Sequence, residues 1–289
     1  DDGYSTFAAL TALTVIEQAD KPRPRVVVLI EGSEESGSPD LPFYIEHLKS
    51  DLREPGLVVC LDSGAGDYER LWVTSSLRGV MVGDLTTRAL SEGVHSGDAS
   101  GVVPSTFRAA RSLLSRLEDQ DTGRILPAGL NPPLPPDVER RTAEAADKLG
   151  KAGMVSCFPF LAGVGTPSDS LTELALNRWW RAQLEVIGAD GLPPSAGAGN
   201  VLRPSTTLTL SLRLPPHLDK KVAEDVVRQT LLGAPAPQGV QSEFRVWKSS
   251  QGWCAPPTAP WLADALTRAG QEAFDGQAPV FQGEGGSIP

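Results

Sequence analysis

The sequence predicts an α/β protein: a mostly parallel sheet with helices on both faces, into which an α+β open sandwich is inserted. Three observations support this prediction. Continuous apolar runs at 26–30 and 57–62 alternate with helical patterns, as buried parallel strands do. From residue 77 onward, alternating strands are separated by amphipathic helices, which is typical of an open sandwich. Helix and strand patterns resume at 260–283, and we expect them to return to the first domain.

The first domain begins with a helical pattern. Phe7, Leu10, Leu13 and Ile16 recur at helical spacing, which predicts an amphipathic helix. The next predicted elements are a strand VVVLI at 26–30, a helix at 39–50 and a strand LVVCLD at 57–62.

The inserted domain is predicted from its alternation of strands and helices. In the predicted strand STTLTLSLRL at 205–214, apolar and polar residues alternate almost without exception. This alternation puts the leucines on one face of the strand and Arg213 on the other. We expect domain boundaries at 1–76, 77–248 and 249–289, with a long insertion near 126–200. The predicted elements are strands at 77–90, 205–214 and 240–247, and helices at 104–118, 136–149 and 220–232. Trp179 and Trp180 are predicted to pack within the insertion or at an interface.

Composition narrows the functional classes. The chain has 289 residues, 26 lysines and arginines, 36 aspartates and glutamates, and a net charge of −10. An acidic surface repels phosphate backbones, so no nucleic-acid partner is expected. No apolar run approaches the roughly 20 residues that cross a bilayer, so no membrane association is expected. Cys60, Cys157 and Cys254 form no CxxC pair, which favours a reducing, cytoplasmic location.

Acidic side chains follow the predicted strands. Glu34 and Glu35 come after the first strand and Asp62 ends the next, while Asp1 and Asp2 precede the first helix. Ligands gather at the carboxyl ends of parallel strands, so we expect these acids to converge. A solvated turn is one interpretation of the adjacent pair. The other is a division of labour, in which one carboxylate holds a metal and the other takes a proton from water.

The ordered motifs resemble a known family. They are DDGYSTFAAL at 1–10, EGSEESGS at 31–38, CLDSG at 60–64, GVHSGDASG at 93–101 and EGGSIP at 284–289. Together they resemble the two-zinc metallopeptidases that include aminoacylase, glutamate carboxypeptidases, succinyl-diaminopimelate desuccinylase and carnosinase-type dipeptidases. Among these, the cytosolic nonspecific dipeptidases look most similar. The resemblance implies a catalytic domain of α/β type and an inserted lid and dimerisation domain.

The resemblance also implies roles for the acidic residues. Asp1 would bridge two metals, with Glu35 a ligand of one metal and Asp62 a ligand of the other. Glu34 would be the general base. The cofactors would be two divalent ions, with zinc expected first and manganese or cobalt as alternatives. The implied reaction is hydrolysis of a dipeptide or related peptide bond by metal-activated water.

Further residues acquire expected roles from the resemblance. His95 would stabilise the oxyanion from the partner subunit of a homodimer formed through the lid; otherwise it is a loop histidine. Arg213 would bind a substrate carboxylate, or else is a solvated arginine on an open sheet. Asn200 would contact the peptide substrate, or else is a turn residue. The loop residues with an expected substrate role, or a plain glycine turn as the alternative, are Glu284, Gly285, Gly286 and Ser287.

The sequence departs from the family pattern in its histidines. The two metal-ligand histidines that the family carries would lie before residue 1 and after residue 289, so the chain is expected to be truncated at both ends. His47 and His217 are expected to be a helix-surface residue and a turn residue. Ser250 and Gln251 stand near the position of a second lid histidine. Two alternatives therefore stay open: an amidohydrolase of N-acyl amino acids, and a non-catalytic relative or fragment that dimerises through the lid and binds peptides.

Overall fold

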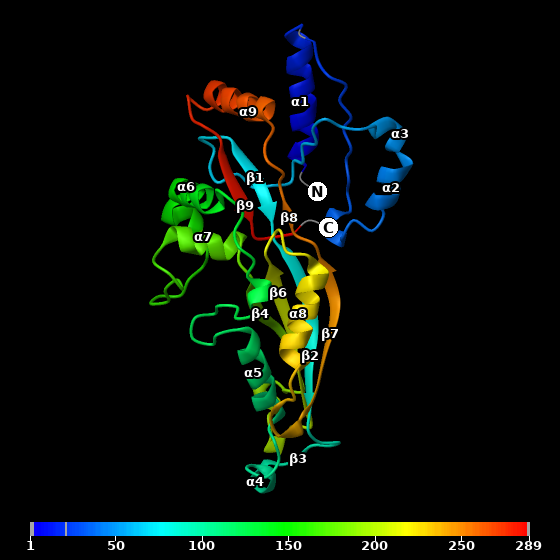
Figure 1. Cartoon of the computed structure of the whole chain (residues 1–289), viewed down its shortest axis with the longest axis vertical. Helices are drawn as coiled ribbons and strands as arrows, with labels where there is room; N and C mark the ends of the chain where they lie inside the picture. Colours follow the sequence, from blue (N-terminus) through cyan, green and yellow to red (C-terminus); the bar gives the residue numbers. More distant parts are fainter. Residues whose placement is uncertain (1–2, 21, 288–289) are drawn as a thin grey trace. The chain divides into compact units, whose positions relative to one another are not determined.

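A computed structural model describes residues 3–20 and 22–287 of the chain. It contains helices and mixed sheets (Figure 1), as the predicted α/β class requires. The chain divides into two compact units, the first within Asp1–Ala65 and the second spanning Gly66–Ser287.

The first unit is helical where it has regular structure. The helix predicted around Phe7–Ile16 and the helix predicted at 39–50 are both confirmed, the second as two consecutive short helices. None of these helices contains a buried residue, and Phe7 is 71% exposed. The elements of this unit are α1 (Tyr4–Gln18), the 3₁₀ turn η1 (Glu34–Ser36), α2 (Leu41–His47) and α3 (Lys49–Leu52).

Two expected strands are wrong in this unit. The runs at 26–30 and 57–62 belong to no strand, and their apolar side chains are exposed, as Val28 at 47% and Val58 at 76% illustrate. The physical reason is the lack of neighbours. A strand is stabilised by hydrogen bonds from adjacent strands and by burial of its faces, and within the described residues no segment pairs with either run. Their apolar composition therefore remains as exposed surface.

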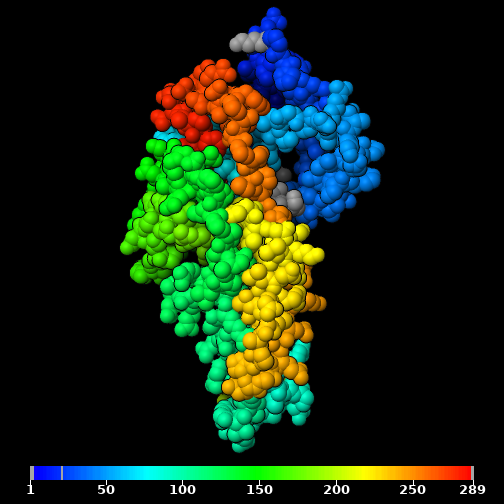
Figure 2. Space-filling view, viewed as in Figure 1, coloured from blue at the N-terminus to red at the C-terminus, as the bar shows by residue number. Residues whose placement is uncertain are grey.

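The second unit contains the predicted open sandwich. Four antiparallel strands lie in the order β4-β6-β2-β7, and helices α5 and α8 contact each other and one face of this sheet. Figure 2 shows α8, in yellow, beside the green segment that contains α5. The elements are β2 (Gly79–Arg88), α5 (Thr106–Leu117), β4 (Gln183–Asp190), β6 (Ser205–Leu214), α8 (Lys220–Leu232) and β7 (Gln241–Ser250).

The leucine face of β6 forms the centre of the main core, as its alternation predicted. Leu210 and Leu212 are fully buried and belong to one cluster with Leu113 of α5 and Val227 of α8. Alternate residues of the strand, from Thr207 to Arg213, are only partly buried. The strand therefore has one core face and one open polar face.

Replacing Leu210 with alanine is expected to destabilise the second unit by about 2–5 kcal/mol, because Leu210 is fully buried and its removal leaves a cavity. Thermal or denaturant unfolding measures the change. Ser211→Ala, on the open face of the same strand, is the matched control and should change the free energy of unfolding by less than about 0.5 kcal/mol. An equal effect of both substitutions would contradict the assignment of the core face.

A smaller sheet lies at one end of this unit. Its strands are β8-β1-β9, with β1 (Trp72–Leu77) parallel to β9 (Val280–Glu284) and antiparallel to β8 (Trp253–Cys254). The pairing of β1 with β9 joins the segment before residue 77 to the last segment of the chain, and both strands lie in the second unit. The return of 249–289 to the first domain stays a prediction. Helix α9 (Pro260–Ala273) confirms the helix expected there.

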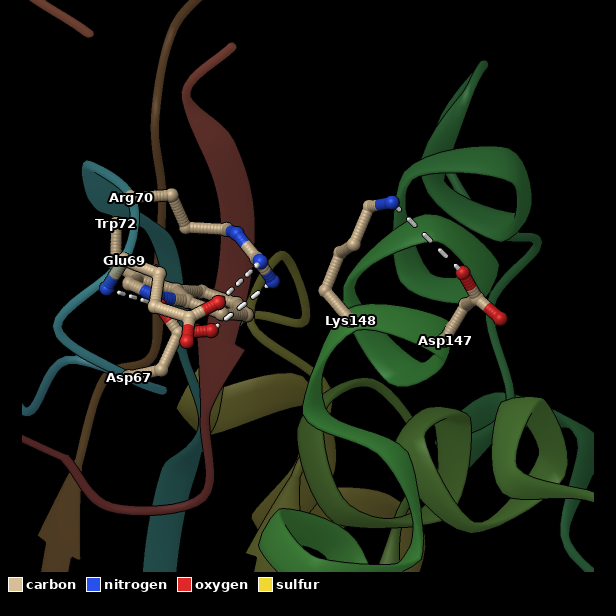
Figure 3. A network of polar contacts seen from close by, with 6 residues as sticks. All are labelled: Asp67, Glu69, Arg70, Trp72, Asp147 and Lys148. Atoms are coloured by element: carbon tan, nitrogen blue, oxygen red, sulfur yellow. Dashed lines mark hydrogen bonds and ion pairs between the residues drawn. The ribbon is translucent and has the colours of Figure 1, made fainter. Parts of the chain in front are cut away.

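An ionic network fixes the entry to β1 (Figure 3). The Asp67 carboxylate accepts a hydrogen bond from Trp72 Nε1 at 3.1 Å and pairs with Arg70 Nη1 at 3.0 Å. The Glu69 backbone N–H donates to the same carboxylate at 2.9 Å. Since the Arg70 side chain is only 12% exposed, this pair is screened less than a surface salt bridge. It fixes the segment 67–72 that leads into β1.

The predicted insertion carries a second core. Trp179 and Trp180 are 2% and 5% exposed and pack with Val280, so their expected role in insertion packing is confirmed. Sequence analysis missed β4, which lies inside the predicted insertion and forms an edge of the main sheet. The remaining elements of the unit are β3 (Val94–His95), α4 (Ser96–Ala99), the 3₁₀ turns Ala128–Leu130, Ser195–Gly197 and Pro237–Gly239, α6 (Val138–Lys151), a π-helical turn Ala152–Ser156, α7 (Leu171–Trp179) and β5 (Val201–Leu202).

Candidate active site

A tight turn presents Glu34 and Glu35. The two residues begin η1, which ends at Gly37 with φ of 89°, a left-handed conformation that favours glycine. The Gly37 and Ser38 backbone N–H groups donate to Glu34 O at 2.7 Å and Ser33 O at 3.2 Å, which closes the turn. Glu34 is partly buried and Glu35 is exposed. The adjacent carboxylates therefore occupy different environments, as a division of labour requires.

The first unit brings Glu34 close to Asp62. Burial, followed by the negative charges of Asp62, Glu35 and Glu31, raises the pKa of Glu34 above its usual value. Burial and the charges of Asp62 and Glu34 also raise the pKa of the Cys60 thiol. The segments 31–35 and 60–62 are thus neighbours in space, although they do not form the expected strand ends. Like charges within a few ångströms oppose ionisation, and a cation would relieve this repulsion.

These carboxylates have the donor chemistry of a divalent-metal site. Glu35 and Asp62 offer hard anionic oxygens, which zinc and manganese both accept. Asp1, the expected bridging ligand, lies outside the described residues. Within residues 3–20 and 22–287, no three or more His, Cys, Asp and Glu side chains are arranged to hold a metal ion. The described donors therefore fit the group chemically but do not by themselves form a complete site.

In the second unit, the structure brings His95 and Asn200 together. Strand β3 pairs with β5, with His95 opposite Val201, and the Ser96 backbone N–H donates to Asn200 O at 2.9 Å. Two candidate residues more than a hundred positions apart in the sequence thus form one small tip with α4. In Figure 1 this tip lies beyond one end of the four-stranded sheet.

The His95 ring has a defined hydrogen-bonding role. Its Nδ1 accepts a hydrogen bond from the Gly97 backbone N–H at 3.2 Å and so caps α4. In the neutral imidazole, an accepting Nδ1 places the proton on Nε2. The side chain is 63% exposed, so Nε2–H is free to donate to a group outside this unit.

At the other end of the sheet, Arg213 lies in a group of arginines. Arg78 connects β1 to β2 and is 8% exposed. Burial, and the charges of Arg213 and Arg178, lower the pKa of Arg78 to about 10, so it stays protonated at neutral pH. Sequence analysis missed Arg78. The available signal was an arginine at the start of the strand predicted at 77–90, since a buried charge needs a specific set of acceptors.

The loop that follows β9 lies beside these arginines. Burial raises the pKa of Glu284, and the positive charge of Arg178 opposes this shift. Gln282 Nε2 donates to Glu284 Oε1 at 3.2 Å. The Arg78 guanidinium donates from Nε to Gly285 O at 3.3 Å. The structure therefore brings Arg213 and the predicted substrate loop to the same end of the unit.

The two groups of candidate residues in this unit are far apart. Arg213 lies eight residues along β6 from Ser205, and His95 lies beyond Ser205, opposite Val201. At about 3.4 Å per residue, eight residues of antiparallel strand span about 27 Å. An extended dipeptide is about 7 Å long. One dipeptide therefore cannot contact both His95 and Arg213 of the same chain.

His47 lies in a short helix of the first unit and His217 in the turn before α8, as expected. His47 stacks on Phe43 of the same short helix, with ring centroids 6.0 Å apart. His217 precedes α8, and its Nε2 lies 3.1 Å from Pro133 O. Gln251, near the expected second lid histidine, is used structurally: it accepts from the Lys220 backbone N–H at 2.9 Å and donates to Leu218 O at 2.8 Å.

Comparison with curated proteins identifies relatives. The chain is 25% identical over 272 residues to Cys-Gly metallodipeptidase DUG1 of Candida albicans and 26% identical over 274 residues to the Saccharomyces cerevisiae protein of that name. Each alignment covers 91% of this chain and 54% of the relative. The chain is thus similar in sequence to these two metallodipeptidases over most of its length. It spans about half the length of the curated relatives it matches, and no family model matches it.

Solved metallopeptidases have a similar fold. Di-peptidase Dug1p from Saccharomyces cerevisiae covers the whole chain with a TM-score of 0.65 and 22% identity, and 60% of that structure is matched. Human carnosine dipeptidase 1 also covers the whole chain, with a TM-score of 0.68, 21% identity and 61% of that structure matched. An M20 family metallo-carboxypeptidase from Sulfolobus solfataricus covers 90% of the chain, with a TM-score of 0.67, 19% identity and 57% of that structure matched. At these low sequence identities, the structural likeness shows a shared fold and nothing further.

Residues 3–20 and 22–287 include no helix that is both long and apolar enough to cross a bilayer.

Proposed function

We propose that this chain belongs to a metal-dependent peptidase that hydrolyses a dipeptide or a related peptide bond. The observation that carries the proposal is the grouping of Glu34, Glu35 and Asp62 in the first unit, where burial and then the charges of Asp62 and Glu35 raise the pKa of Glu34. The sequence relatives are metallodipeptidases, and grouped carboxylates offer the hard anionic oxygens that divalent metal ions bind.

In this proposal, Glu34 is the general base. It takes a proton from the attacking water and delivers it to the leaving amine. A carboxyl whose pKa is raised by burial and neighbouring charges is a better proton acceptor than an ordinary glutamate. Its placement on a closed turn, apart from the more exposed Glu35, leaves its oxygens available for this transfer.

The metal would be held by Glu35 and Asp62, with Asp1 as the expected bridging ligand. Two divalent ions, zinc first and manganese or cobalt as alternatives, would supply a water of lowered pKa and polarise the scissile carbonyl. The donor oxygens suit all three ions, so the metal's identity rests on the resemblance and not on these side chains.

Substrate binding is assigned to the second unit. Arg213 would bind a substrate carboxylate, because a planar guanidinium can donate two parallel hydrogen bonds to it. Backbone amides of Gly285 and Gly286, with the Ser287 hydroxyl, would contact the same end of the peptide, and Glu284 would face the other. Asn200 would contact a substrate from the tip that it shares with His95.

The proposal includes a homodimer. His95 and Arg213 of one chain cannot reach the same dipeptide, so a His95 that stabilises the oxyanion acts on a site of the partner subunit. The exposed Nε2–H of His95 supports this role, since an oxyanion needs a donor that is not already used. A cytoplasmic location is also proposed, because Cys60, Cys157 and Cys254 are all free thiols.

Elemental analysis of the purified protein tests the metal assignment. We expect bound divalent metal in the wild-type protein and a clear loss in Asp62→Ala, because removal of a charged ligand weakens a site that already depends on few donors. Asp51→Ala, on the exposed surface of α3, is the matched control and should retain the metal. Absence of metal from the wild-type protein would contradict the hydrolytic function and favour a non-catalytic peptide-binding relative. A metalloprotein that cleaves only N-acyl amino acids would instead support the amidohydrolase alternative.

A further inference from the structure

Arg78 is a buried arginine that pairs with backbone carbonyls instead of a carboxylate. Its Nη1 donates to Asn177 O at 3.1 Å and Arg181 O at 3.4 Å, and its Nε donates to Gly285 O at 3.3 Å. None of the ion pairs among the described residues includes Arg78. A buried charge is costly unless it is fully hydrogen-bonded, so these carbonyls account for its position.

The carbonyl groups that accept these hydrogen bonds belong to two separate structural elements. Asn177 lies in the last turn of α7 and Arg181 lies just beyond it, where helix carbonyls lack intrahelical partners and carry partial negative charge. Gly285 lies directly after β9. One guanidinium thus joins the end of a helix to the loop that follows a strand.

The backbone of Arg78 adds a second connection to the same loop. Its N–H donates to Glu284 O at 3.3 Å, next to the side-chain bond to Gly285 O. The loop also packs closely here. A Cβ added at Gly285 would lie 3.3 Å from both Arg78 Nη2 and Arg178 O, which is tighter than most contacts of a real Cβ. Two consecutive peptide units of the loop are therefore fixed against one residue.

We propose that Arg78 is a positioning residue that holds the backbone of Glu284 and Gly285 in place beside Arg213. The hydrogen bonds of Arg78 fix this loop on the body of the second unit, and Arg213 lies opposite Val80, two residues along the chain from Arg78. The functional part of this inference, that the fixed loop serves substrate binding, rests on the proposed function.

Arg78→Lys tests the role while retaining a positive charge. A lysine has one compact ammonium group and cannot span the loop and α7 as the planar guanidinium does. The matched control is Arg116→Lys. The Arg116 guanidinium likewise donates to three carbonyls, those of Leu231, Ala234 and Pro235, but it is placed between α5 and the end of α8.

The first measurement is backbone hydrogen exchange of residues 283–287 in the purified protein and both variants. We expect exchange in this segment to accelerate at least about tenfold in Arg78→Lys, because charge-assisted hydrogen bonds that hold it are lost. Arg116→Lys should leave this segment unchanged and accelerate exchange near 231–235. Equal exchange of 283–287 in the two variants overturns the proposal.

The second measurement is dipeptide hydrolysis. For Arg78→Lys we expect KM to rise about tenfold and kcat to change less than about threefold, since the loop binds substrate but does not transfer protons. A fall in kcat alone, with KM unchanged, overturns the substrate-binding part. If the wild-type protein cleaves no dipeptide, the proposed function fails, and hydrogen exchange alone still decides whether Arg78 positions the loop.

Discussion

Glu34→Gln is expected to lower kcat for dipeptide hydrolysis by about 10²–10⁴-fold, the usual contribution of a general base. Glutamine keeps the size and shape of the side chain but cannot accept the proton of the attacking water. Glu34 is not one of the proposed metal ligands, so metal should be retained. Steady-state kinetics and elemental analysis on the same sample separate loss of chemistry from loss of metal.

Glu46→Gln is the matched control for this experiment. Glu46 lies in α2 and pairs with Lys49 at 3.3 Å in a largely exposed ion pair, which contributes little to stability. We expect kcat of this variant to match that of the wild type. If Glu34→Gln retained wild-type kcat with metal bound, Glu34 could not be the base, and another group would have to accept the proton.

Two inactive variants are expected to restore activity when their chains are mixed. His95→Ala should lower kcat by about 10²–10³-fold, the typical effect of removing an oxyanion donor. In a mixed dimer with Glu34→Gln chains, one of the two sites has both an intact Glu34 and an intact His95 from the partner chain. Random mixing of equal amounts should therefore restore about a quarter of the wild-type activity in a two-fold symmetric dimer.

A second mixture provides the control. Chains with Glu34→Gln and chains with Asp62→Ala both lose a group of the first unit, so every site of their mixed dimer lacks one of the two. This mixture should stay inactive. Recovery in both mixtures, or in neither, would contradict a site completed by His95 of the partner, and sedimentation of the protein as a monomer would remove the basis of the prediction.

The second unit was the more predictable part of the fold. The alternation at 205–214 and the amphipathic pattern at 220–232 match β6 and α8 at both ends, because each pattern is a direct record of one buried and one exposed face. The strand β4 was missed because Val186 and Ile187 are exposed on an edge. An edge strand with a solvent-facing apolar pair leaves no clean alternation in the sequence.

The strand content of the first unit, in contrast, was not predictable from the sequence. The apolar composition of 26–30 is that of a strand, yet pairing depends on neighbouring strands that a local pattern does not reveal. Glu34 and Asp62 lie near enough to influence each other electrostatically, but not at the shared sheet edge from which the convergence of the acids was predicted, and their common site stays a prediction. The role of Arg78 could not be predicted, because its acceptors are backbone carbonyls brought together only by the tertiary fold.

The bond between Arg78 and Gly285 also bears on how the chain folds. These residues are 207 positions apart in the sequence, so the contact closes a very long loop and carries a large entropic cost before it forms. Contacts of such high sequence separation slow folding and tend to form late. The four-stranded sheet can assemble from residues that precede β9, whereas the loop can dock only after nearly the entire unit has been synthesised. During synthesis, the four-stranded sheet with its helices and its His95 tip can therefore fold first. The loop at 284–287, which docks at the opposite end of the sheet, is made only afterwards.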